Sequence, residues 1–140
     1  SMYGDTENAA IILACKLADA GVKNIAMYDV SSTHVSTLVA EVFRCSHLVL
    51  AAPTYNNGLY PAMANFLHDM KALNLQKRTV GLIENGSWAP VSGKTMQAMV
   101  GELKGMTLLE PVVTLKSALK GDSMEQLDAL AGQIIATLAE

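Results

Sequence analysis

Aromatic residues, cysteines and long apolar runs are all scarce in this sequence. Aromatic residues make up 5% of the chain, and no apolar run approaches the roughly 18 residues that span a bilayer. Cys15 and Cys45 are the only cysteines and lie far apart in the chain, which predicts two free, buried thiols in a reducing compartment. These features argue against a membrane protein and a disulfide-stabilised secreted protein, and they favour a cytoplasmic location.

Positive charge is scarce as well. The chain has 10 Lys and Arg against 13 Asp and Glu, with a net charge of −3 and no cluster of basic residues, so nucleic acid is not an expected partner. His34, His47 and His68 are far apart and lack the spacing typical of metal ligands. We therefore predict no metal site within this chain. Ser87 lacks a nucleophile elbow and a candidate His–acid pair, so we predict no catalytic side chain either.

Helical and strand patterns alternate along the 140 residues, which have the length of one domain covering 1–140. Helical periodicity predicts helices over 6–20, 35–43, 61–73 and 91–103, and from 122 or 123 to 138. Strands are predicted near 25–30, 48–53, 79–84 and 107–115, the last one split. Because each parallel crossover needs a helix, this alternation predicts an α/β fold with a parallel sheet covered on both faces.

The first predicted element is a helix, with no strand before it in this sequence. In a doubly wound sheet the first strand is central and leads into the first helix. We therefore expect four strands here and a central fifth strand from upstream residues or from a partner chain. Its omission would leave a gap of about two strand spacings, roughly 9–10 Å.

Three loops rich in small polar residues are predicted at the carboxyl edge of the sheet, where open α/β folds bind ligands. Residues 1–6 combine hydroxyl groups and Gly4 with the start of a helix, a pattern suited to a phosphate held by backbone N–H groups. No Lys or Arg lies in or beside this loop, which favours a single phosphate over a triphosphate with Mg²⁺. An ordinary N-cap at Thr6 is the alternative.

The other two loops, 53–58 and 85–88, have the residues expected of a slot for a flat heterocycle. Tyr55 and Trp88 can offer π faces, while Asn56, Asn57 and Asn85 can hydrogen-bond to the edge of a ring. For Trp88 the alternative is a place in the core or at an interface. Together the three loops predict a nucleotide-type site.

The same loops resemble a known family, the flavodoxin-like FMN domains, and most closely the C-terminal flavodoxin module of flavodiiron proteins (A-type flavoproteins). The resemblance is carried by Ser-Met-Tyr-Gly-Asp-Thr at 1–6, Ala-Pro-Thr-Tyr-Asn-Asn-Gly at 52–58, Phe-Leu-His-Asp-Met at 66–70 and Glu-Asn-Gly-Ser-Trp-Ala-Pro at 84–90. It implies a three-layer α/β/α fold with strand order 2-1-3-4-5, the first, central strand being absent from this chain. The domain would then be a fragment of a larger flavodiiron-type protein.

The resemblance also implies FMN as the cofactor. The residues that match its binding loops are Ser1, Met2, Tyr3, Gly4, Asp5, Thr6, Pro53, Thr54, Tyr55, Asn56, Asn57, Gly58, Asn85, Gly86, Ser87 and Trp88. It implies an electron-transfer domain that relays electrons from a reductase or rubredoxin-like donor to a diiron domain reducing O₂ or NO. The oxidoreductase activity would belong to the full-length protein. A homodimer or a homotetramer is compatible with this interpretation.

Two other functions are consistent with a fold of this class. A stand-alone NAD(P)H-quinone or azo reductase would show steady NADH oxidation without a protein partner. A non-enzymatic, receiver-like binding module would need a phosphoacceptor Asp after the third strand of the fold, where this chain has Ala-Ala-Pro-Thr at 51–54. Flavin uptake by the purified protein distinguishes a flavoprotein from the receiver-like module.

Overall fold

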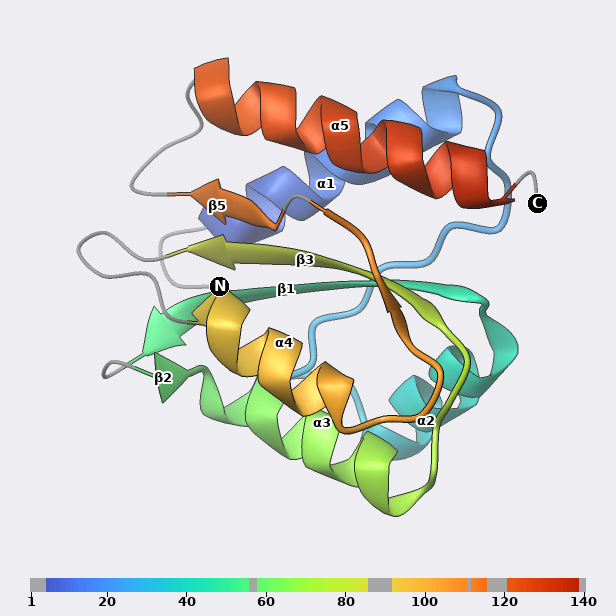
Figure 1. The fold of residues 1–140 in the computed structure, drawn as a ribbon, viewed down its shortest axis with the longest axis vertical. Helices are drawn as coiled ribbons and strands as arrows, with labels where there is room; N and C mark the ends of the chain where they lie inside the picture. The colour runs from blue at the N-terminus through green and yellow to red at the C-terminus, as the bar shows by residue number, and fades with distance from the viewer. Residues whose placement is uncertain (1–4, 56–57, 86–91, 111, 116–120, 139–140) are drawn as a thin grey trace.

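The computed structural model describes residues 5–55, 58–85, 92–110, 112–115 and 121–138. A parallel sheet lies between two layers of helices, with α1 and α5 on one face and α2, α3 and α4 on the other (Figure 1). In chain order the elements are α1 (Asp5–Asp19), α2 (Val35–Arg44), β1 (His47–Tyr55), β2 (Gly58–Leu59), α3 (Pro61–Ala72), β3 (Thr79–Asn85), α4 (Ser92–Gly101), β4 (Thr107–Leu108), β5 (Val113–Leu115) and α5 (Gly121–Leu138).

The helix boundaries follow local signals in the sequence. Gly21, two residues after the end of α1, has a φ of +93°, and its N–H donates to the Ala18 carbonyl at 3.0 Å, an ending that favours glycine. Pro61 begins α3, where its missing N–H has no cost. Arg78 supports the end of α2, because its guanidinium donates to the carbonyls of Val42 at 3.2 Å and Phe43 at 3.1 Å.

The sheet has the order β2-β1-β3-β4, with β5 also paired to β3. β1 and β3 are parallel from His47↔Thr79 to Pro53↔Asn85. β4 and β5 pair in parallel with successive parts of β3, which confirms the predicted split strand. The antiparallel β2 was not predicted from the sequence.

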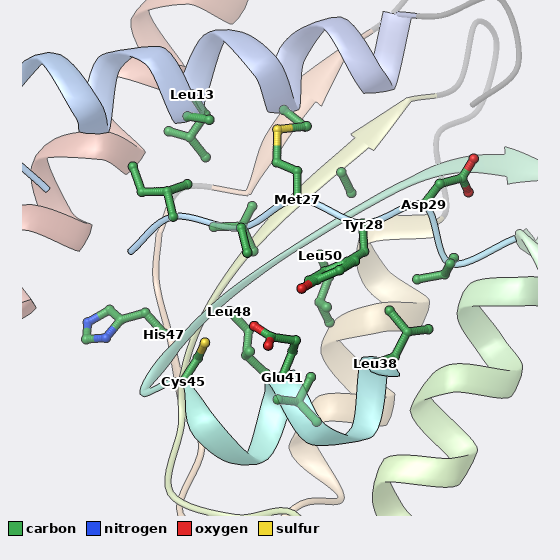
Figure 2. A pocket seen from close by; sticks show the side chains of 18 of the residues that line it. Leu13, Met27, Tyr28, Asp29, Leu38, Glu41, Cys45, His47, Leu48 and Leu50 are labelled. Carbon is green, nitrogen blue, oxygen red and sulfur yellow. The ribbon is translucent and has the colours of Figure 1, made fainter. Parts of the chain in front are cut away.

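The predicted strand over 25–30 is wrong. This segment lines the same cavity as β1 (Figure 2) but pairs with none of the described strands, and residues 23–28 make no backbone–backbone hydrogen bond in the described part of the chain. The apolar pattern is that of a strand, yet a strand also requires a neighbour at hydrogen-bonding distance. No such neighbour lies beside this segment among the described strands.

Two smaller expectations also need correction. Cys15 is exposed and Cys45 is half-buried, so the prediction of two buried thiols is wrong. The buried face of α1 carries Leu13 and Leu17, and a residue two positions from each points away from it. The last helix begins at Gly121, so Ser123 lies in its first turn, where its hydroxyl donates to the Thr114 carbonyl at 3.4 Å.

Each face of the sheet has its own hydrophobic core. One core joins α2, α3 and α4 to the sheet through residues such as Leu38, Phe66 and Met96. The other joins α1 and α5 through residues such as Leu13 and Leu127. Among the described residues, no helix combines the length and the apolar character needed to cross a membrane.

His47 links the start of β1 to the end of α5. Its Nε2 lies 2.8 Å from Thr137 Oγ1, and its Nδ1 lies 2.8 Å from Ser46 Oγ. The Thr137 hydroxyl is within donor distance of the carbonyls of Gln133 and Ile134, so we assign Nε2–H as the donor to Thr137 and Nδ1 as the acceptor from Ser46. This network holds the neutral imidazole, and partial burial lowers the pKa of His47 below 6.5.

We expect this histidine to make the protein less stable in mildly acidic solution. Between the lowered folded-state pKa and the unfolded value near 6.5, the unfolded chain binds more protons, so the free energy of unfolding falls as pH decreases through that window. His47→Gln should make the free energy of unfolding depend less on pH, as measured by urea unfolding at several pH values from neutral to mildly acidic. His68→Gln, at an exposed position on α3, is the matched control. Equal pH dependence in wild type and His47→Gln would contradict the assignment.

Candidate functional site at the carboxyl edge of the sheet

The described ends of the three predicted loops lie at one edge of the sheet. Pro53 and Asn85 are register partners at the carboxyl ends of β1 and β3, so the loops that follow these strands leave from neighbouring positions. The amino end of α1 lies at the same edge (Figure 1), and Thr6 lines the same cavity as Pro53. The parallel register therefore brings together segments that are far apart in the sequence.

Thr6 has an unusual environment for a hydroxyl group. Thr6 is only 2% exposed, and its Oγ1 is buried with no hydrogen-bond partner among the residues that the structure describes. A buried hydroxyl without a partner costs about 1–3 kcal/mol. It lies in the first turn of α1, where helical N–H groups also lack intrahelical acceptors and carry a partial positive charge. This combination suits an anionic acceptor.

Glu84 organises the next part of the edge. It is 8% exposed; its Oε2 accepts from the Gly93 N–H at 2.6 Å and its Oε1 accepts from the Thr114 hydroxyl at 2.9 Å. Gly93 is in the first turn of α4, so a carboxylate on β3 satisfies a donor at a helix N-terminus. Glu84 thereby joins β3 to α4 and β5.

Ser92 makes a second connection to the start of α4. It is fully buried, and its hydroxyl donates to the Ala52 carbonyl of β1 at 3.1 Å. Asn85, 9% exposed, ends β3, so both flanks of the segment 86–91 are held by the ends of β1 and β3. The contacts of Ser92, Gly93 and Thr114 were not predicted from the sequence; a Ser-Gly pair at a helix start after a strand-end acid is the signal that points to them.

The structure describes part of the predicted site. Described are Asp5, Thr6, Pro53, Thr54, Tyr55, Gly58 and Asn85, whereas Ser1, Met2, Tyr3, Gly4, Asn56, Asn57, Gly86, Ser87 and Trp88 lie outside the described residues. Tyr55 and Gly58 are partners in the antiparallel β1–β2 pairing, so the described residues on either side of 56–57 lie opposite each other. In the described part of the chain, no group of three or more His, Cys, Asp or Glu could hold a metal ion.

Comparison with known proteins extends these observations. No protein-family profile matches the sequence. The rubredoxin-oxygen oxidoreductase of Megalodesulfovibrio gigas is 29% identical over 140 residues, covering 99% of this chain and 34% of that protein. The chain thus spans about a third of the length of this relative.

Solved structures show the same similarity. The rubredoxin oxygen:oxidoreductase of Desulfovibrio gigas superposes with a TM-score of 0.82 and 26% identity, over 99% of this chain and 35% of that one. A flavodiiron core from Synechocystis gives a TM-score of 0.85 at 13% identity, covering 99% of this chain and 34% of that one. Flavodoxin 1 from Bacillus cereus gives a TM-score of 0.78 at 19% identity, covering 97% of this chain and 92% of that one.

The parallel sheet with helices on both faces is a flavodoxin-like α/β fold, as predicted from the sequence. The candidate site lies at the carboxyl edge of the sheet, where folds of this class bind ligands. Within this class, the chain is related in sequence to rubredoxin-oxygen oxidoreductase, and its fold matches that of a flavodiiron core.

Proposed function

We propose that this chain is an FMN-binding electron-transfer domain. It would receive electrons from a rubredoxin-like or reductase partner and deliver them to a diiron domain that reduces O₂ or NO. The relation to rubredoxin-oxygen oxidoreductase supports this role, and the observation that carries the cofactor assignment is the buried, unpartnered hydroxyl of Thr6 at the start of α1, where no partner lies among the described residues. Bound FMN supplies the one- and two-electron redox chemistry.

The residues at the site fit a phosphate better than a neutral ligand. Thr6 can donate its hydroxyl proton to a phosphate oxygen, and the first N–H groups of α1 add further donors and a partial positive charge. The resemblance to flavodoxin-like FMN domains implies that residues 1–5 belong to the same phosphate-binding loop. These groups would hold the phosphate end of the cofactor without a Lys or Arg side chain.

The remaining residues would position the ring and exclude water from it. The loops that follow Tyr55 and Asn85 would lie on either side of the cofactor, since the two strands are register partners at their ends. Glu84 and Ser92 hold the flanks of the second of these loops through Gly93 and Ala52. In this proposal no side chain acts as an acid or a base.

The cofactor assignment is tested by titrating the flavin-free protein with FMN and, in parallel, with riboflavin. Riboflavin has the same ring and ribityl chain but no phosphate, so a phosphate site should make FMN bind more tightly by about tenfold or more. Quenching of flavin fluorescence measures both affinities. Equal affinities would show that the phosphate is not recognised.

The electron-transfer role is tested on the FMN-loaded protein. Reduced rubredoxin should bleach its visible absorption on mixing, whereas NADH alone should not. Sustained oxidation of NADH without a protein partner would favour the quinone or azo reductase instead.

A further inference from the structure

The carboxylate of Glu84 lies on a face of β3 that is otherwise apolar. Side chains alternate between the two faces of a strand, so Val80, Leu82 and Glu84 share one face. Val80 and Leu82 belong to the hydrophobic core that joins α2, α3 and α4 to the sheet, and Glu84 is only 8% exposed. Burying a charged group is unfavourable unless neighbouring groups compensate for the lost water.

Neutral donors provide this compensation. Glu84 Oε2 accepts from the Gly93 N–H at 2.6 Å, and Glu84 Oε1 accepts from the Thr114 hydroxyl at 2.9 Å. In the described part of the chain, Glu84 forms no ion pair. The amino end of α4 adds a partial positive charge. Loss of either donor would therefore leave a carboxylate oxygen buried without its partner, which is unfavourable.

The residues that meet here are aligned across three strands. The parallel register pairs Ala52 of β1 with Glu84 of β3, and Glu84 with Thr114 of β5. Register partners have their side chains on the same face of a sheet, so the Thr114 hydroxyl reaches Glu84 directly. The first two residues of α4 attach to this row, because Ser92 donates to the Ala52 carbonyl and Gly93 donates to Glu84. We call Ala52, Glu84 and Thr114 the edge row.

Thr114 is itself held by α5, which lies in the helical layer opposite α4 (Figure 1). Its N–H donates to Gln126 Oε1 at 2.9 Å, and its carbonyl accepts from the Ser123 hydroxyl at 3.4 Å. Both backbone groups of Thr114 are therefore used by one helix, while its side chain is used by Glu84. A continuous series of hydrogen bonds runs from α5 through Thr114 and Glu84 to the start of α4.

We infer that Thr114 is a positioning residue for the proposed FMN site. Its hydroxyl fixes one oxygen of Glu84 so that the other accepts from Gly93, and this holds the end of β3 and the start of α4 at a set spacing. Asn85 and Ser92, their neighbours along the chain, are buried and flank one of the loops proposed to contact the cofactor. The inference rests on the proposed function and adds a residue from outside the three loops.

A purely structural hydrogen bond is the alternative, and the two roles differ in what a substitution changes. Loss of a structural bond lowers the free energy of unfolding but leaves the ligand affinity of the folded protein unchanged. Loss of a positioning bond also weakens every ligand that uses the positioned loop. Thr6 lines the cavity beside β1, which neither Glu84 nor Thr114 lines. Removing the Thr114 hydroxyl should therefore weaken FMN and riboflavin equally, because it leaves the proposed phosphate contact intact.

The test compares three variants. Thr114→Val removes the hydroxyl at nearly constant volume, and Thr114→Ser keeps it. Thr107→Val, at an exposed position on β4, is the matched control for replacing a strand threonine by valine. Hydrogen exchange of the Gly93 amide is measured in the flavin-free proteins. Quenching of flavin fluorescence gives the affinities for FMN and for riboflavin without denaturant.

In Thr114→Val we expect the Gly93 amide to exchange about tenfold faster, because Glu84 is no longer held against it. FMN and riboflavin should each bind about tenfold more weakly, with the ratio of their affinities unchanged. Thr114→Ser should restore both properties to near the wild-type values, and Thr107→Val should leave both unchanged.

Wild-type exchange at Gly93 in Thr114→Val would overturn the inference, since Glu84 would then hold α4 without Thr114. So would a less stable Thr114→Val protein that binds both flavins normally, which would identify a structural hydrogen bond. If the wild-type protein binds neither flavin, the proposed FMN site is wrong, whereas the exchange at Gly93 still decides whether Thr114 positions the start of α4.

Discussion

Thr6→Val is expected to weaken FMN binding by about tenfold to a hundredfold while leaving the flavin-free protein at least as stable as the wild type. A hydrogen bond to a charged phosphate contributes about 1.5–3 kcal/mol, and the substitution removes its donor. In the flavin-free protein the same hydroxyl is buried without a partner among the described residues. Replacing it with a methyl group of similar size therefore removes a buried polar group and its unfavourable desolvation.

The opposite signs of these two effects distinguish a ligand-binding hydroxyl from a structural one. Thr6→Ser, which keeps the hydroxyl, is the matched control and should retain most of the FMN affinity. Fluorescence titration measures binding, and urea unfolding of the flavin-free proteins measures stability. A Thr6→Val protein that is clearly less stable but binds FMN normally would identify Thr6 as a helix cap and remove it from the site.

Gly93→Ala is expected to lower the free energy of unfolding by about 2–3 kcal/mol. A Cβ atom at this position would lie 2.6 Å from Oε2 and 2.7 Å from Cδ of Glu84. The Glu84 side chain is 8% exposed and also accepts from Thr114, so it has little room to move away. The substitution should break the Glu84–Gly93 hydrogen bond and loosen the start of α4.

The same change should weaken FMN binding, because Asn85 and Ser92 flank one of the loops proposed to contact the cofactor. Gly101→Ala at the end of α4 is the control, since no atom lies within 4 Å of the added Cβ, and it should leave stability unchanged or raise it by up to about 1 kcal/mol. Urea unfolding of both variants measures the change in the free energy of unfolding. If both variants unfold like the wild type, Glu84 does not hold the start of α4.

Elements whose formation depends on local pattern were well predicted. The helix that ends before Gly21 and the helix that begins at Pro61 follow from backbone preferences of single residues. The apolar runs that became β1 and β3 were predicted as buried parallel strands, and they pair from His47↔Thr79 to Pro53↔Asn85. Their parallel direction places the following loops at one edge, so the place of the candidate site in the fold could be predicted from the sequence as well.

The segment 25–30 shows where pattern alone was insufficient. Its apolar residues have strand character, but Ile25 and Met27 remain exposed and the segment has no partner among the described strands. Strand formation depends on hydrogen bonds to a neighbour, and the occupancy of a neighbouring position is not written in the segment itself. β2 was missed for a related reason, because its two residues form a strand only through their pairing with Thr54 and Tyr55.

The sequence by itself determined the alternation of helices and strands, the edge at which polar loops gather and the absence of a cluster of basic residues. These properties depend on composition or on residues close together in the chain. Only the tertiary structure decided that the Thr6 hydroxyl is buried without a partner among the described residues, that Glu84 joins α4 to β5, and that β1 and residues 23–31 line one cavity. Each of these depends on contacts between residues distant in sequence. Burial and hydrogen-bond satisfaction are set by the packing of whole layers.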